Sequence, residues 1–202
     1  MDNTIGITGG IGAGKSVVAR VLRCNGFPVY DCDSRAKWLM EKDDKVKSAL
    51  LSKIGKETFL PDGRINKIFL TQRLFTDTQV RNQVNAIVHD AVRKDIQTKR
   101  EKIAGLFFIE SAILASGGIA PFCSQVWIIE SPKEERFQRL FKRDKTNEEE
   151  IVKRMRTQEM EIDLLKNYNT LILHNNASEP LLSEVLKLTN KYKNHQTYKI
   201  SC

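Results

Sequence analysis

The sequence lacks the features that would place it among membrane or repeat proteins. No stretch of its 202 residues approaches the roughly 20 consecutive apolar residues that a membrane-spanning helix needs. The chain leads from its first residues straight into a predicted strand, so we expect no signal peptide. It contains no internal repeat and no low-complexity segment, which excludes repeat architectures. We therefore expect a globular protein of the cytoplasm.

Cysteine is scarce as well, and the four cysteines are scattered along the chain. Cys24, Cys32, Cys123 and Cys202 form no C-x-x-C pair and no spacing typical of a metal site. This distribution excludes a disulfide-rich scaffold and a cysteine-based zinc site. We expect reduced thiols with mostly packing roles, in agreement with a reducing cytoplasm.

Neither length nor charge decides the function by itself. A chain of 202 residues with 41% hydrophobic and 29% charged residues has the composition of a globular protein and can bury a sizeable core. This length suits one α/β domain with room for an inserted subdomain. The formal net charge of +8 is not gathered in one block, so it fits a polyanionic small-molecule substrate as well as a nucleic acid. Both interpretations stay open at this point.

The most informative stretch is Gly9–Ser16, which reads GGIGAGKS and matches the pattern G-x-x-x-x-G-K-S/T at every fixed position. A predicted strand over 4–8 precedes it and a predicted helix from Val17 follows it, which is the context that this motif requires. Glycines let consecutive backbone N–H groups turn toward an anion, and the N-terminus of the helix adds positive potential. The motif predicts binding of a nucleoside triphosphate, with Lys15 at the β- and γ-phosphates and Ser16 on Mg²⁺. The predicted nucleotide-binding residues here are Thr8, Gly12, Ala13, Gly14, Lys15, Ser16 and Val17.

The rest of the chain alternates between short strands and helices. Apolar runs predict four further strands, over 27–30, 106–110, 125–129 and 170–173. Between the second and third strands lie about seventy residues of almost wholly helical pattern, far more than one crossover connection needs. One of these helical stretches has as its apolar positions Ile68, Leu70, Leu74 and Phe75. We therefore predict a single domain over 1–202, with a core of 1–33 and 103–190, a helical substrate-binding insert at about 34–102 and a polar tail at 191–202.

Acidic residues follow two of the predicted strands. Asp31 and Asp33 come at the end of the second strand, and their side chains point the same way while the chain stays extended. A carboxylate beside the phosphate loop can accept a hydroxyl proton and orient the nucleophile, but Asp33 can also simply cap the next helix. Glu110 closes the third strand, where an acid can hold the Mg²⁺ shell through water together with Ser16.

A basic helix is predicted after Ser131–Pro132, with Arg136, Arg139 and Arg143 on one face. One interpretation is a solvent-exposed face compensated by nearby acids, namely Glu134, Glu135 and Asp144. The other, which we favour in a chain with a phosphate loop, is a set of arginines that closes on an anion. Asn175, at the end of the last strand, is placed either to meet the nucleotide base or to make a structural turn.

Three classes of phosphate-loop protein compete for this pattern. A GTPase should carry an N/T-K-x-D guanine motif, and the sequence contains none. An ATPase that works on nucleic acid usually needs more than 202 residues. A small-molecule kinase needs a phosphate loop, a helical acceptor-binding insert after the second strand and a late arginine-bearing lid helix. The sequence supplies all three in that order.

In these motifs the chain resembles the dephospho-coenzyme A kinase family along nearly its whole length. The motifs that carry the resemblance are, in chain order, 7–16, Asp31-Cys32-Asp33, 62–67, 74–77, Ile87-Val88-His89, 138–144, 154–158 and Asn175. Three positions depart from the family pattern. Asp90 stands where the family has proline, and Glu110 stands where it has aspartate. Ala112–Ser116 replaces the stretch P-L-L-F-E, so the acid of that stretch is missing or displaced.

The resemblance implies a P-loop kinase fold of the α/β class, with a five-stranded parallel sheet flanked by helices, an inserted helical substrate subdomain and a lid helix. It implies transfer of the γ-phosphoryl group of ATP, with Mg²⁺, to the ribose 3′-hydroxyl of dephospho-coenzyme A. The implied catalytic residues are Asp33 as the base, with Lys15, Arg139 and Arg143.

The resemblance also implies the partner. This partner is a small molecule, and we expect neither a nucleic acid nor a membrane. The phosphates of the acceptor would meet basic residues of the insert, namely Arg64, Lys67, Arg73 and Arg93. Two alternatives stay open: a kinase of another nucleoside or nucleotide, and an ATP-binding regulator without catalytic activity.

Overall fold

The computed structural model describes residues 3–144, 147–176 and 181–197. The chain divides into two compact units, Met1–Asp31 with Ile103–Cys202 and Cys32–Lys102. We call the first the sheet unit and the second the helical unit. The helical unit begins at Cys32 because a helix starts directly after the second strand ends.

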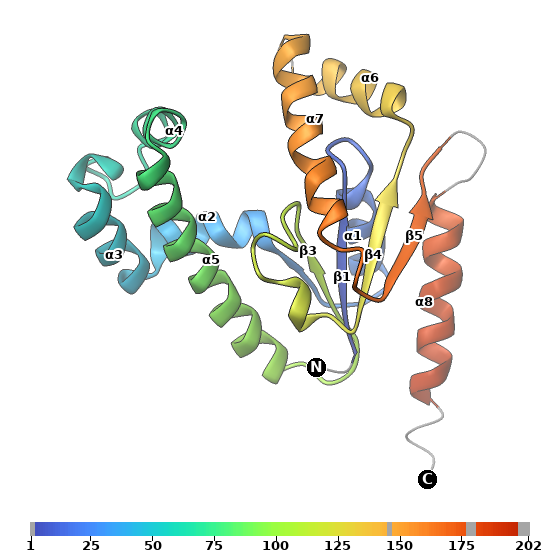
Figure 1. Ribbon diagram of the computed structural model, residues 1–202. Helices are drawn as coiled ribbons and strands as arrows, with labels where there is room; N and C mark the ends of the chain where they lie inside the picture. The colour runs from blue at the N-terminus through green and yellow to red at the C-terminus, as the bar shows by residue number, and fades with distance from the viewer. Residues whose placement is uncertain (1–2, 145–146, 177–180, 198–202) are drawn as a thin grey trace. The chain divides into compact units, whose positions relative to one another are not determined.

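The sheet unit is built on five parallel strands, as predicted (Figure 1), and the strands lie in the order β2-β3-β1-β4-β5. The strands are β1 (Thr4–Gly9), β2 (Val29–Asp31), β3 (Phe107–Glu110), β4 (Gln125–Glu130) and β5 (Thr170–His174). β1 lies in the centre, paired with β3 on one side and with β4 on the other. Parallel strands end at the same edge, so the loop after β1 emerges in the middle of the carboxyl edge, where open α/β sheets bind their ligands.

Helices cover both faces of this sheet. α1 (Lys15–Cys24) and α8 (Leu181–Thr197) contact each other, and their apolar residues join the strands in one core cluster that includes Leu22, Trp127 and Val185. α7 (Glu148–Asp163) contacts β1 and lies in front of the sheet in Figure 1, whereas α1 lies behind it. β1 is buried along its whole length because both of its faces are covered.

The last helix is longer than predicted. α8 ends at Thr197, so the stretch expected to be a polar tail from Lys191 is helical as far as that residue, and 198–202 lies outside the described residues. Tyr192 gives a physical reason, because its hydroxyl donates to Gln125 Oε1 at 3.1 Å and its ring stacks on Trp127. Within the described ranges, no helix combines the length and the apolar character needed to cross a membrane.

The helical unit is organised around its longest helix. It comprises α2 (Cys32–Lys42), α3 (Asp44–Ile54), α4 (Lys67–Thr76) and α5 (Thr78–Glu101). Every fourth residue of α5 is buried, and α2, α3 and α4 each contact this helix. Arg35 donates to Asp95 through two hydrogen bonds of 2.7 and 2.9 Å, which tie α2 to α5.

The apolar positions predicted for α4 are only partly correct. Leu70 is buried, but Ile68 is 82% exposed and Phe75 is 68% exposed. α4 has ten residues and packs against α5 and the short 3₁₀ turn at Lys56–Thr58, so one narrow face is enough to hold it.

Candidate active site

The phosphate loop, Gly9–Ser16, joins β1 to the first residues of α1. Gly12 and Gly14 have φ angles of 78° and 111°, in the left-handed region that disfavours residues with a side chain. Gly14 is the N-cap of α1, and no described side chain caps this helix. The first N–H groups of α1 therefore lack the usual capping acceptor. Together with the helix dipole they make this end of the helix suited to a phosphate group.

The predicted triphosphate residues are brought together by this loop and its two flanking elements. The Lys15 ammonium group lies back over the loop, where it donates to the carbonyl oxygens of Gly9 at 2.8 Å and Gly10 at 3.2 Å. Ser16 and Val17 are exposed in the first turn of α1, whereas Ala13 and Thr8 are buried. Two hydrogen bonds thus hold the Lys15 ammonium group at the loop, and Ser16, the next residue, is exposed to solvent.

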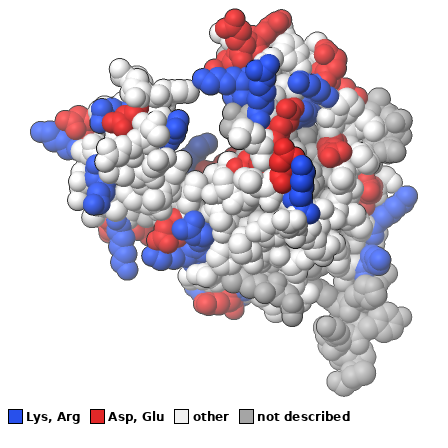
Figure 2. Space-filling view, viewed as in Figure 1, with Lys and Arg blue, Asp and Glu red and all other residues white. Residues whose placement is uncertain are grey.

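The basic helix α6 (Lys133–Asp144) lies against the loop through Arg139. Its guanidinium group donates to the Gly12 carbonyl oxygen at 3.2 Å, to Ser131 Oγ at 2.9 Å and to Glu135 Oε2 at 2.6 Å. The nearby acids do compensate the arginines, as one of the two interpretations expected, because Glu135 pairs with Arg139 and Asp144 pairs with Arg143. Figure 2 shows basic and acidic side chains gathered together over this part of the sheet unit.

Arg136, the first arginine of this face, is a functional candidate that sequence reasoning named but did not select. It is only 8% exposed, and its guanidinium lies against Gly10 of the phosphate loop. It forms an ion pair with Glu159 at 3.4 Å, and its Nε atom is buried without a hydrogen-bond partner in the described structure. The residue borders a cavity of about 370 Å³ beside the loop. The helical period put it on a shared face with Arg139 but gave no sign that this part of the face is buried.

Asn175 contacts the loop itself. Its side-chain amide donates to the Ala13 carbonyl oxygen at 2.7 Å, and its backbone N–H donates to the Glu130 carbonyl oxygen at 2.7 Å. A Cβ added to Gly14 would lie 2.5 Å from Asn175 Nδ2. These contacts support the structural alternative for Asn175, in which it fastens the end of β5 to the phosphate loop.

The predicted acids fall into two different settings. Asp31 and Glu110 are direct neighbours across the β2–β3 register, at the carboxyl edge of the sheet. The expectation that Asp31 and Asp33 share an extended strand is wrong, because α2 starts at Cys32. Asp33 is exposed and is the second residue of that helix, so it is an acid of the first turn rather than the N-cap residue.

A carboxylate from elsewhere in the chain reaches the stretch that departs from the family pattern. Glu161 of α7 is buried, and its Oε2 atom accepts a hydrogen bond from the Ser116 backbone N–H at 3.2 Å. Residue 116 is the position at which the family pattern has its acid. No sequence signal connects the two positions, which lie 45 residues apart.

The basic residues expected to meet the acceptor are mostly paired within the helical unit. Arg64 pairs with Asp62, Arg73 with Asp77 and Arg93 with Asp90, at N–O distances of 2.7, 3.4 and 3.6 Å. Each pair joins residues at most four positions apart. Lys67 is the first residue of α4.

Comparison with known proteins decides between the classes of phosphate-loop protein. A family model described as dephospho-CoA kinase matches residues 3–180, a span that contains the phosphate loop, the helical unit and Asn175. The chain belongs to the dephospho-CoA kinase family. Membership in this family means that the protein is a kinase and uses ATP as its phosphoryl donor.

Curated dephospho-CoA kinases resemble the chain over most of their length. The one from Porphyromonas gingivalis is 43% identical over 164 residues, which are 81% of this chain and 81% of the relative. The one from Bacteroides fragilis is 33% identical over 186 residues, which are 91% of this chain and 90% of the relative.

Solved structures share the fold of the family. The crystal structure of a Thermus thermophilus protein has a TM-score of 0.76 at 30% identity, covering 93% of this chain and 96% of its own. The dephospho-CoA kinase from Campylobacter jejuni has a TM-score of 0.70 at 21% identity, covering 96% of this chain and 100% of its own. The α/β fold with five parallel strands is therefore that of P-loop kinases.

Proposed function

We propose that this protein transfers the γ-phosphoryl group of ATP to the ribose 3′-hydroxyl of dephospho-coenzyme A, giving coenzyme A and ADP. The observation that carries the proposal is a complete phosphate loop at the N-terminus of α1, in a chain that a dephospho-CoA kinase model matches over 3–180. Phosphoryl transfer needs positioning and charge stabilisation more than covalent chemistry, and this loop with its arginine helix offers both.

In this proposal the loop binds the triphosphate. The backbone of Gly12, Ala13, Gly14, Ser16 and Val17 would surround the phosphates, and Thr8 supports the loop from its buried place in β1. The Ala13 and Val17 N–H groups donate to the Gly10 and Gly14 carbonyl oxygens at 3.1 and 3.0 Å, so these two residues help to hold the loop in shape. The Lys15 ammonium group leaves the two loop carbonyl oxygens and turns to the β- and γ-phosphate oxygens. That exchange replaces two neutral acceptors by charged ones, which form the stronger hydrogen bonds. Asn175 holds the loop in shape through Ala13 and lies next to the space that a base would take.

The residues present fit a Mg²⁺ ion. Kinases hold this ion through one or two protein groups, with phosphate oxygens and water completing an octahedral shell. Ser16 would provide the hydroxyl ligand, and Glu110, beside Asp31 at the same sheet edge, would hold the shell through water. When bound, the ion neutralises charge on the β- and γ-phosphates.

The acceptor would meet Asp33, which lies two residues beyond the end of β2, in the first turn of α2. As the general base, its carboxylate accepts the proton of the 3′-hydroxyl and orients the oxygen toward the γ-phosphorus. Arg139 and Arg143 donate to the phosphoryl group in transit, where negative charge spreads over its oxygens. We further propose that the two units act as one kinase domain in the cytoplasm, without nucleic acid or membrane as a partner. The scattered free cysteines support that location.

The proposal is tested by incubating the purified protein with ATP, Mg²⁺ and separate acceptors, and by identifying products with mass spectrometry. We expect dephospho-coenzyme A to gain one phosphoryl group with matched formation of ADP. Preference for another nucleoside or nucleotide would identify a different kinase. Tight ATP binding without phosphorylation of any acceptor would instead support the alternative that the protein is an ATP-binding regulator without catalytic activity.

A further inference from the structure

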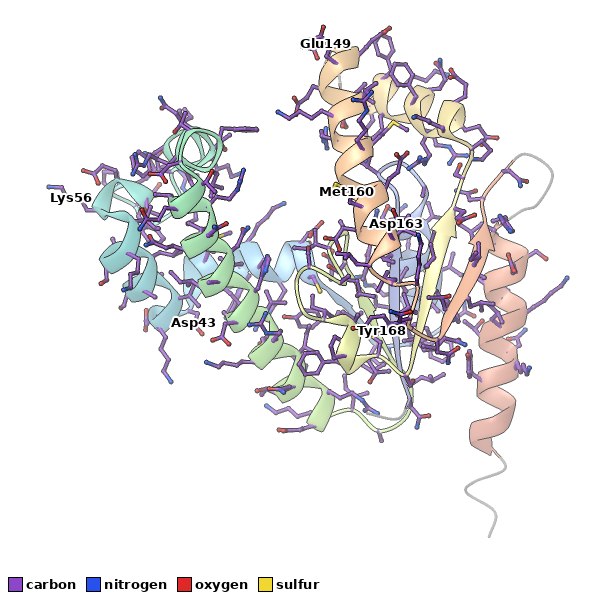
Figure 3. All side chains as sticks on the ribbon, in the orientation of Figure 1. Asp43, Lys56, Glu149, Met160, Asp163 and Tyr168 are labelled. Atoms are coloured by element: carbon purple, nitrogen blue, oxygen red, sulfur yellow. The ribbon has the colours of Figure 1, made fainter. Side chains whose placement is uncertain are left out.

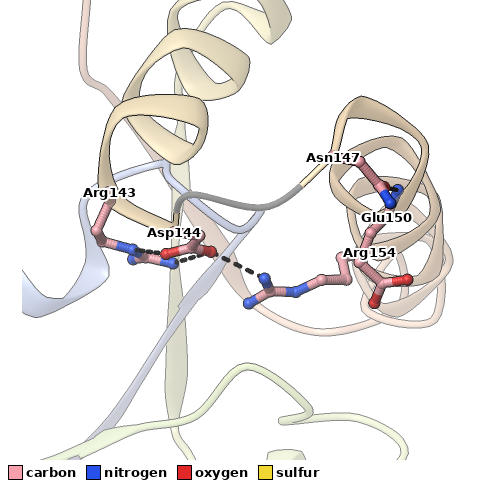
Figure 4. Close-up of polar contacts among 5 residues, drawn as sticks. All are labelled: Arg143, Asp144, Asn147, Glu150 and Arg154. Atoms are coloured by element: carbon pink, nitrogen blue, oxygen red, sulfur yellow. Dashed lines mark hydrogen bonds and ion pairs between the residues drawn. The ribbon is translucent and has the colours of Figure 1, made fainter.

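The carboxylate of Asp144 joins two arginines from different helices (Figure 4). It accepts hydrogen bonds from Arg143 Nε at 2.5 Å and Arg143 Nη2 at 3.0 Å, and a third from Arg154 Nη1 at 2.8 Å. The Asp144 side chain is 16% exposed, against 60% for Arg143 and 41% for Arg154. The acid is therefore enclosed, while both guanidinium groups keep part of their surface open to solvent.

This triad joins the last turn of α6 to α7. Leu140 of α6 is 3.3 Å from the position of a Cβ on Gly12, and Ile11 packs against the apolar cluster that Leu140 forms with Ile151 and Met155 of α7. α6 thus contacts the loop directly, and α7 is joined to the loop through the apolar cluster that it shares with α6. Arg143 follows Arg139, the residue bonded to Gly12, by one helical turn, and Arg154 directly precedes Met155.

The contacts leave donors available on both arginines. Among the described residues, Arg143 donates to Asp144 through Nε and Nη2 and makes no hydrogen bond through Nη1, and Arg154 donates to Asp144 through Nη1 alone. Two guanidinium groups at this separation would repel each other without the acid between them. One carboxylate and two guanidinium groups leave a net charge of +1, which suits an anion such as a phosphoryl group in transfer.

We propose that Asp144 is a positioning residue for phosphoryl transfer and that it holds the guanidinium groups of Arg143 and Arg154 together. In this arrangement Arg154 also contacts the phosphoryl group that is being transferred. This inference rests on the proposed function. Asp144 acts through the arginines and contacts no substrate. Its removal lets both long side chains swing away from the geometry that the transition state needs. A displacement of about 1 Å in such groups costs up to roughly a hundredfold in rate.

The test compares Asp144→Asn with wild type, and with Asp163→Asn as a matched control. Asp163 also forms an ion pair, with Lys166, but lies on α7 at the end opposite Glu149 (Figure 3). We expect Asp144→Asn to lower kcat by about tenfold to a hundredfold, with KM for ATP changed far less. The control should keep the wild-type values. Circular dichroism establishes that each variant is folded.

A double-mutant cycle with Arg154→Met tests whether Asp144 acts through that arginine. If it does, Asp144→Asn should lower kcat by a much smaller factor in the Arg154→Met background than in wild type. An Asp144→Asn variant with wild-type kcat, or equal costs in both backgrounds, overturns the inference. Loss of thermal stability with unchanged kcat also overturns it, since the acid would then be only structural. Failure of wild type itself to phosphorylate dephospho-coenzyme A would refute the proposed function instead.

Discussion

The guanidinium group of Arg136 occupies the space that a side chain on residue 10 would need. Its Nη1 atom lies 1.8 Å from the position of a Cβ on Gly10, and its central carbon lies 2.9 Å away. Gly10 has an ordinary backbone conformation, because it is not among the residues of positive φ. A side chain at residue 10 is therefore opposed by the arginine that packs there and not by the shape of the loop, and it fits only if the guanidinium group moves.

Gly10→Ala should consequently destabilise the phosphate loop by forcing Arg136 out of its buried place. Overpacking of this kind costs about 1–3 kcal/mol in the free energy of unfolding, measured by urea denaturation. KM for ATP should rise as the loop shifts. In an Arg136→Ala background the added methyl group meets no guanidinium group. Gly10→Ala should therefore lower the free energy of unfolding much less in that background than in wild type. Equal costs in both backgrounds would mean that the contact is not the cause.

Lys15→Ala should abolish turnover while leaving the fold intact. The Lys15 side chain donates to two loop carbonyl oxygens and is not part of the apolar core cluster, so little packing is lost. We expect kcat to fall by at least about a hundredfold, the scale for losing one charged donor to the transition state. Steady-state kinetics measures the loss of turnover, and circular dichroism shows whether the fold is intact. Unchanged activity, or an unfolded variant, would count against the assigned role.

Asp33→Asn separates catalysis from helix stabilisation. As an acid of the first turn of α2, Asp33 stabilises the helix by a few tenths of a kcal/mol through the helix dipole. Thermal unfolding should therefore show only a small loss of stability in Asp33→Asn. As the general base, its loss should lower kcat by about a hundredfold or more with ATP binding unchanged. Asp44→Asn, in the first turn of α3, is the matched control and should retain full activity. Near-full activity of Asp33→Asn would make the catalytic assignment wrong.

Arg139→Ala and Arg143→Ala should lower kcat more than they raise KM for the acceptor. Both guanidinium groups are expected to meet charge that develops during transfer, so each loss should cost about a hundredfold in kcat. Arg139→Ala should also raise KM for ATP, because it releases the Gly12 carbonyl oxygen. Lys142→Ala removes a cation from the same helix and is expected to be silent. An effect confined to KM for the acceptor would assign the helix to acceptor binding.

The ion pairs of Asp144 make a pH-dependent contribution to stability. The hydrogen bonds from Arg143, with those from Arg154, lower the pKa of Asp144 to about 2, below the value near 3.9 expected in the unfolded chain. A carboxyl group whose pKa is lowered by folding stabilises the folded state fully above its unfolded pKa. That contribution is lost as the pH falls through the range from about 4 to about 2. The difference in unfolding free energy between wild type and Asp144→Asn should therefore shrink over this range. A constant difference would show that the acid is not paired.

Short-range rules explain why much of the architecture could be predicted from sequence. The phosphate loop is encoded by glycines whose backbone angles few other residues adopt, such as Gly12 and Gly14, and by the strand and helix that flank it. The five strands follow from apolar runs, and their parallel arrangement agrees with the helices between them. The place of the helical unit follows from an excess of helix between two strands.

The loop residues proposed to bind the triphosphate could be named for the same reason, since their proposed role depends on neighbours within a few positions. Asp33 marks the limit of such reasoning. The sequence identifies the motif that contains Asp33, but the conformation of Asp33 depends on where β2 ends and α2 begins. The exact ends of helices and strands are the least certain feature of a prediction from sequence.

The sequence by itself determined the phosphate loop, the order of the elements and the family, because these depend on neighbouring residues and on their period along the chain. Only the tertiary structure decided that Arg136 is buried against Gly10, that Glu161 reaches Ser116, and that Asp144 joins Arg143 to Arg154. A helical period tells which side chains share a face, but it does not tell what covers that face. Burial and pairing across long separations arise when the helices pack onto the sheet and bring distant charges together.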